Sequence, residues 1–195
     1  MNTNTSKEKK KVNTKKISGI GLMIALAFVL SYIKLYDMPM GGSITLEMIP
    51  LVIMGLRHGV KWGTFTAAVH GIIQLILGFS NVMYCATIPA MIGCVLLDYL
   101  FAFTVLGLAG VFLPLFKNKL IGAAVGTAIC GALRFLCSFL SGWLLWGSYA
   151  PKGWSVVYYS LIYNGSYMLP NIIIGVIVIL IIGKTAPGFL FQKQE

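Results

Sequence analysis

The stretch GWLLWGSYAPKGWSVVYYSLIYNG, residues 142–165, joins two long apolar runs through a short segment crowded with Trp and Tyr. Each flanking run exceeds the ~18 apolar residues that mark a membrane-spanning helix. The short connection brings Trp146, Tyr159 and Asn164 toward one another. Rings that can stack beside a polar amide suit a flat heteroaromatic ligand better than an ion or a sugar. The stretch therefore predicts a helix pair with a ligand site near its connected end.

The rest of the chain is equally apolar. Its 195 residues are 58% hydrophobic and 10% charged, with a mean hydropathy of +0.87, which excludes a soluble domain. We predict an all-α integral membrane bundle of six helices, residues 17–183, between a basic cytoplasmic tail at 1–16 and a short cytoplasmic tail at 184–195. The expected spans are 17–36, 44–57, 61–79, 88–116, 119–149 and 154–183.

The basic residues are placed as a topology signal. Six of the 15 lie in the first sixteen residues, and most others fall at the ends of predicted spans. An excess of Lys and Arg marks cytoplasmic loops, so the net charge of +10 indicates both termini inside rather than a nucleic-acid surface. We expect a multi-pass protein of a prokaryotic cell membrane.

Two charged residues lie deep in predicted spans. Asp98 is the only acidic residue well inside one, and a carboxylate there costs about 3 kcal/mol on insertion scales, so it needs a partner. One interpretation makes Asp98 the acceptor and counter-charge for a cationic or amino-bearing ligand. The other pairs it with Arg134, the only basic residue deep in a span.

Further candidates for the site lie on three predicted helices. Ser138, Gly142 and Trp146 recur every four residues, so we place them on one face of the fifth helix, where Gly142 leaves room beside the indole. Trp146 fits a stacking role and an interfacial aromatic belt equally well. Glu47, at the outer start of the second helix, is either a pocket residue or a charge at a favourable helix N-terminus.

Catalytic and nucleotide-binding motifs are incomplete in this sequence. Gly183-Lys184-Thr185 resembles the end of a P-loop, but Val178 occupies the required first glycine position. No HExxH motif, metal-ligand cluster or nucleophile constellation stands out, and the four cysteines lack CxxC spacing. We therefore expect no enzyme activity, no cofactor and no metal.

Several stretches of the chain carry a family resemblance. Residues 17–183 are similar to the thiamine-binding S-components of energy-coupling-factor (ECF) vitamin transporters. The similarity rests on ALAFVLS (25–31), IPLVIMGLRHG (49–59), Asp98-Tyr99, and above all WGSYAPKGW (146–154) followed by YYSLIYNG (158–165).

The resemblance implies a subunit that captures thiamine near the outer face of the membrane. It implies a separate transmembrane coupling protein and two cytoplasmic ATPases as partners, with ATP used only by those partners. In the family, the position of Trp146 stacks on the vitamin, and those of Tyr159, Asn164 and Asp98 bind the aminopyrimidine. An aromatic at the position of Tyr99 lies near the thiazolium.

The remaining expectations complete the site and the interface. Tyr84, at an outer loop, joins the set of predicted ligand-binding residues. Gly21 and Ala25 share one face of the first helix, and the matching face in the family docks on the coupling protein.

Two positions depart from the family pattern. Asp98 stands where Glu is typical, and Ser138 stands where His is expected. A pyrimidine precursor of the hydroxymethylpyrimidine type, or another vitamin, is therefore the first alternative substrate. An integral membrane enzyme or a structural partner protein is the alternative from another class.

Overall fold

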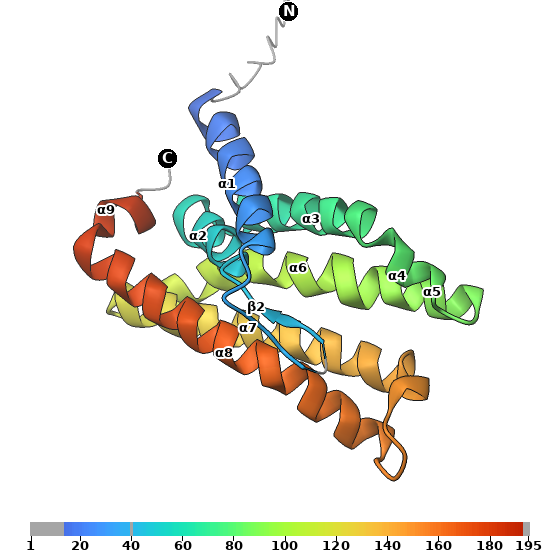
Figure 1. The fold of residues 1–195 in the computed structure, drawn as a ribbon. Coiled ribbons are helices and arrows are strands. Elements are labelled where there is room, and N and C mark those ends of the chain that lie inside the picture. Colours follow the sequence, from blue (N-terminus) through green and yellow to red (C-terminus); the bar gives the residue numbers. More distant parts are fainter. Residues whose placement is uncertain (1–13, 40, 193–195) are drawn as a thin grey trace, which may run out of the picture.

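The computed structural model describes residues 14–39 and 41–192. Its helices pack into one bundle, some nearly antiparallel and others crossing at a large angle (Figure 1). The elements follow in this order: α1 (Thr14–Tyr32), β1 (Tyr36–Asp37), β2 (Ser43–Ile44), α2 (Met48–His58), α3 (Val60–Leu77), α4 (Phe79–Met83), α5 (Ile88–Cys94), η1 (Val95–Phe101), α6 (Ala102–Thr104), η2 (Val105–Leu115), α7 (Lys119–Leu144), η3 (Gly147–Tyr149), α8 (Val156–Thr185) and α9 (Pro187–Leu190). Helices α7 and α8 run side by side, and strand β2 of the hairpin packs against α8.

Within residues 14–39 and 41–192, four helices are long and apolar enough to cross a membrane. They are α3, the continuous run Ile88–Leu115 formed by α5, η1, α6 and η2, and then α7 and α8. Helices α1 and α2 are apolar but shorter. The prediction of a helical membrane protein is confirmed, whereas the count of six spans and the cytoplasmic termini stay predictions.

The hairpin changes the ends of two predicted spans. The first was expected to reach residue 36 but ends at Tyr32, and the second was expected from residue 44 but begins at Met48. Asn171 of α8 explains the later start of the second helix, because its side chain accepts from the Thr45 N–H (2.8 Å) and donates to the Ser43 carbonyl (3.1 Å). These bonds satisfy backbone groups in an extended conformation, so helix loses its advantage there.

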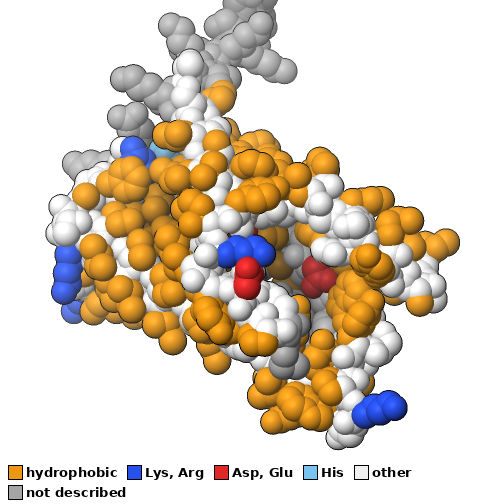
Figure 2. Space-filling model, viewed as in Figure 1, with side chains coloured by type: hydrophobic (Ala, Val, Ile, Leu, Met, Phe, Trp, Pro, Cys, Tyr) orange, Lys and Arg blue, Asp and Glu red, His pale blue; other side chains and the backbone are white. Residues whose placement is uncertain are grey.

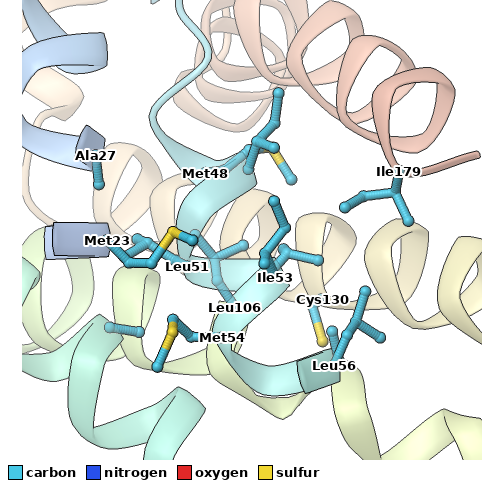
Figure 3. Close-up of a cluster of buried hydrophobic side chains, with 14 of the residues drawn as sticks. Met23, Ala27, Met48, Leu51, Ile53, Met54, Leu56, Leu106, Cys130 and Ile179 are labelled. Atoms are coloured by element: carbon cyan, nitrogen blue, oxygen red, sulfur yellow. The ribbon is translucent and has the colours of Figure 1, made fainter. Parts of the chain in front are cut away.

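Helix α2 forms the centre of the core. Every residue from Met48 to Leu56 is buried, and the helix is surrounded by side chains from α1, η2, α7 and α8, among them Met23, Leu106, Cys130 and Ile179 (Figure 3). Its 11 residues rise only about 16 Å, roughly half of a ~30 Å hydrocarbon layer. Helix α2 is therefore an internal element, wrapped by the longer helices.

Glycines allow the backbones of α2, α3 and η2 to touch. A Cβ on Gly107 would overlap with the backbone of Gly63, and one on Gly55 would overlap with the Gly107 carbonyl. In lipid, close backbone approach of this kind is a main source of helix association, because apolar side chains gain little by leaving the hydrocarbon.

The two predicted tails are described only in part, and their boundaries stay predictions. Residues 1–13 of the predicted N-terminal tail, and 193–195 at the other end, lie outside the described residues. Beyond residue 183 the chain continues α8 to Thr185 and then forms α9, whose Leu190 is fully buried. Arg57 of α2 fixes this turn by donating to the Phe189 carbonyl at 2.8 Å.

Candidate functional site

A cavity of about 1160 Å³ opens between the hairpin, the C-terminal part of α3, the run Ile88–Leu115, α7 and α8. Figure 2 shows this hollow with acidic side chains at its edge, one of them beside a basic side chain, in a face where apolar groups predominate. Its lining includes all nine residues predicted to bind ligand: Glu47, Tyr84, Asp98, Tyr99, Ser138, Gly142, Trp146, Tyr159 and Asn164. Their role as ligand contacts stays a prediction.

Asp98 holds the indole of Trp146. One of its carboxylate oxygens, Oδ2, accepts from Ser141 Oγ at 2.6 Å and from Trp146 Nε1 at 3.2 Å. The alternative that pairs Asp98 with Arg134 is wrong, because the Arg134 guanidinium binds a different carboxylate. Trp146 also lies just beyond α7, which ends at Leu144 and not at the expected residue 149. The carboxylate, rather than a helical backbone, therefore fixes the ring.

Tyr99, the next residue, is held by the segment that follows α3. Its hydroxyl donates to the Gly78 carbonyl at 3.0 Å and accepts from Asn81 Nδ2 at 3.3 Å. Asp98 and Tyr99 belong to η1, a π-helical turn, which is wider than an α-helical turn and recurs at functional sites. In this turn two consecutive residues, bonded to different helices, both line the cavity.

Asn164 belongs to a hydrogen-bonded group between α7 and α8. Its amide donates to the Ser160 carbonyl (3.0 Å) and to Ser160 Oγ (3.2 Å), and its oxygen accepts from the Tyr167 hydroxyl (2.9 Å). Ser160 Oγ in turn donates to the Phe139 carbonyl at 2.7 Å. These bonds fix the direction of the amide.

Gly142 has a different role from the one expected. We expected it to leave room beside the Trp146 ring. A Cβ at this position would overlap with Ser160 Oγ and come within 3.0 Å of Asn164 Nδ2. The space beside Gly142 is therefore filled by α8, and the glycine sets the distance between α7 and α8.

Three tyrosines form a ladder along α8. Tyr159, Tyr163 and Tyr167 are four residues apart and all line the cavity. The ring centroids of Tyr159 and Tyr163 are 5.6 Å apart, and those of Tyr163 and Tyr167 are 5.9 Å apart. Only Tyr159 was predicted to bind ligand, although the four-residue spacing of the other two is visible in the sequence.

The hairpin is packed against this ladder. Gly41 has φ +102°, and a Cβ there would lie 2.7 Å from the Tyr163 hydroxyl. Gly42 has φ +80° and is in equally close contact with the Tyr167 ring. A positive φ and a missing side chain are both required at these positions, so glycine is needed for the hairpin to cover the cavity.

The first strand of the hairpin is held by an ion pair with the residue two positions before it. Lys34 Nζ lies 3.0 Å from Asp37 Oδ1, which also accepts from Ser43 Oγ at 2.5 Å. The Ser43 hydrogen bond, and then the Lys34 ammonium, lower the pKa of Asp37 below its usual value. The Asp37 charge is thus engaged within the hairpin.

A second polar group in the cavity lining is centred on Glu47. Glu47 accepts from Arg134 Nη2 at 2.6 Å and from Gln74 Nε2 at 2.9 Å, and His70 Nε2 lies 3.8 Å away. The Arg134 guanidinium also sits 4.3 Å from the centroid of the Phe103 ring. Glu47 lines the cavity and also stands at the N-cap position of α2, so the structure shows both of the placements considered for it.

These features define a class: a helical membrane protein with a covered cavity, lined by aromatic rings and oriented polar groups, of a size for a small organic molecule. The sequence model described as "Thiamine transporter protein (Thia_YuaJ)" matches residues 17–191. The chain belongs to this family, as the resemblance in its sequence indicated.

Two relatives and one solved structure support the assignment. Thiamine transporter ThiT of Bacillus subtilis (strain 168) is 37% identical over 88% of this chain and 91% of its own length. Thiamine transporter ThiT of Lacticaseibacillus paracasei is 28% identical over 89% of each chain. A solved structure of ThiT from Listeria monocytogenes superimposes with a TM-score of 0.74 at 26% identity, covering 91% of this chain and 97% of that one. The chain is thus a multi-pass membrane transport protein rather than an enzyme.

Proposed function

We propose that this protein is the substrate-binding component of an ECF-type importer and captures thiamine in the cavity described above. One observation carries the proposal most directly. Of the two carboxylates among the described cavity-lining residues, Glu47 is neutralised by Arg134, whereas Asp98 is bonded only to neutral donors. The cavity therefore has one negative charge left for a cationic ligand, and the thiazolium ring of thiamine carries a permanent positive charge.

The arrangement of rings and amides suits the two halves of thiamine. Trp146 offers a planar surface for the aminopyrimidine, while Asp98, Asn164 and Tyr159 line the same cavity with donors and acceptors for its edge. The faces of Tyr99 and Tyr84 supply π-surfaces for the thiazolium, an attraction of about 2 kcal/mol or more when it is desolvated. We assign no catalytic role to any of these residues.

The outward face of α1 supports docking on a separate coupling protein. Gly21 and Ala25 are both exposed, and a Cβ added at Gly21 would meet nothing within 4 Å. Gly122 and Gly126 of α7 form a second pair of small residues four positions apart, but this pair is used internally, because added Cβ atoms would press on the Phe112 and Ala109 carbonyls. The α1 pair is thus available to a second membrane helix, and ATP hydrolysis would be supplied by partner ATPases on the cytoplasmic side, where both termini of a six-span bundle would lie.

Calorimetric titration of the detergent-purified protein tests the substrate. Thiamine should bind one-to-one, without ATP or partners, more tightly than hydroxymethylpyrimidine, which lacks the cation, and riboflavin should not bind. Equal affinity for thiamine and the pyrimidine would move the assignment to the precursor. Binding of another vitamin with no heat from thiamine would contradict the proposal.

A further inference from the structure

A groove on the surface of the bundle is separate from the ligand cavity. It has a volume of about 610 Å³ and runs between the first half of α3 and α6. Its lining residues are Lys61, Trp62, Thr64, Phe65, Ala68 and Thr104. The charge lies at one end, in the first turn of α3, and the walls beyond it are apolar or carry only threonine hydroxyls.

The groove continues into an exposed apolar stripe of α3. Lys61, Phe65, Ile72 and Ile76 follow one another at intervals of four, seven and four residues, which places them on one side of the helix. The exposed fractions of the three apolar side chains are 53%, 47% and 68%. A charged end leading to a long apolar strip matches a molecule with an ionic head and a hydrocarbon tail.

The charged end of the groove is strictly cationic. Lys61 is exposed there, and Lys16 Nζ lies 5.2 Å from the centroid of the Trp62 ring that lines the groove. The carboxylate side chains among residues 14–39 and 41–192 are Asp37, Glu47 and Asp98, and none of them lines this groove. The cationic end is therefore complementary to an anion and has no internal counter-charge.

We propose that this groove binds an anionic phospholipid, with the phosphate against Lys61 and an acyl chain along Phe65 and Ala68. Basic residues near the headgroup level attract anionic lipid, each contributing about a fivefold change in affinity. Trp62 suits this position because indoles favour the boundary between headgroups and hydrocarbon. A protein partner in the same groove is the competing occupant.

Native mass spectrometry of the purified protein, titrated with dioleoyl phosphatidylglycerol or dioleoyl phosphatidylcholine, tests the site. The wild type should retain the anionic lipid preferentially. Lys61→Gln should weaken that binding about fivefold, and Ala68→Trp should weaken it without changing the charge, because the indole fills the groove. Lys119→Gln is the matched control, since Lys119 is also an exposed lysine at a helix start but lies outside the groove.

Thiamine binding should be unchanged in all three variants, which shows that each is folded. The proposal is overturned if the two lipids bind equally, or if Lys61→Gln and Lys119→Gln lose the same affinity. It is also overturned if the groove variants reduce uptake in cells at normal abundance while lipid binding is unaltered, which would assign the groove to a protein partner.

Discussion

The indole N–H of Trp146 donates to the Asp98 carboxylate across 3.2 Å, joining the residue after α7 to the π-helical turn η1. The same carboxylate oxygen accepts from Ser141. The Trp146 ring, which we propose stacks on the ligand, is thus oriented by the Asp98 carboxylate, which we propose balances the positive charge of the ligand. Changes at either residue should therefore affect both stacking and charge.

Asp98→Asn removes the charge but keeps one acceptor for Ser141 or Trp146. Thiamine affinity should fall by roughly 1.5–3 kcal/mol, or about 10- to 150-fold, the scale for losing a charge-assisted hydrogen bond. Hydroxymethylpyrimidine, which is neutral, should lose less. Calorimetry with both ligands measures the difference, and an equal loss for the two would show that the carboxylate acts only through the position of the indole.

Trp146→Ala and Trp146→Phe separate stacking from the hydrogen bond. Loss of an aromatic stacking partner costs about 1–3 kcal/mol per base in comparable sites, so Ala should lower affinity roughly 5- to 150-fold. Phe retains a ring but cannot donate to Asp98, so its loss should be intermediate. If both variants bind alike, the indole is an interfacial anchor. Quenching of Trp fluorescence by thiamine should disappear in both.

Gly142→Ala should destabilise the fold, because the new methyl group overlaps with Ser160 Oγ. Overpacking of this kind costs about 1–3 kcal/mol. Thermal unfolding in detergent should show a lower midpoint, partly restored in the double variant with Ser160→Ala. Gly21→Ala is the matched control, because its Cβ would meet nothing within 4 Å. A similar drop for both substitutions would mean that steric overlap is not the cause.

Glu47→Ala should destabilise the fold more than the removal of both Glu47 and Arg134 charges. It leaves the Arg134 guanidinium mostly buried without its carboxylate, a situation that costs about 3–5 kcal/mol. The double variant Glu47→Ala/Arg134→Met should recover much of the lost stability, since no unpaired charge remains. Unfolding midpoints of the two single variants and the double variant give the coupling energy, and simple additivity would argue against a working ion pair.

Some residues of this site are recognisable from the sequence alone, and others are not. Burying a polar side chain within a membrane span costs free energy, so Asp98 and Asn164 stand out among apolar neighbours in the sequence. Trp146 stands out because it lies in the aromatic-rich connection. All three line one cavity. The partner of Arg134 does not stand out in this way, because Glu47 lies 87 residues away and nothing local distinguishes it from Asp98.

The hairpin was missed for a related reason. Its extended backbone is bonded to Asn171, which is 126 residues beyond Thr45 in the sequence. Apolar composition alone favoured a longer first helix there. The adjacent Gly41 and Gly42 were the local signal that could have predicted a turn, since both adopt positive φ.

Ala25→Trp distinguishes capture from transport. Ala25 is exposed on α1, on the face that we propose docks on the coupling protein, so an indole there should hold the two membrane helices apart without disturbing the cavity. Thiamine affinity of the isolated protein should be nearly unchanged, while uptake in cells that express the whole complex should be lost. Ala27→Trp is the control, because Ala27 is fully buried and its substitution should abolish folding itself.

Protein abundance must be measured beside uptake, since poor expression gives the same loss. Normal transport at normal abundance would remove this face from the interface, and loss of thiamine binding in Ala25→Trp would assign the residue to the fold.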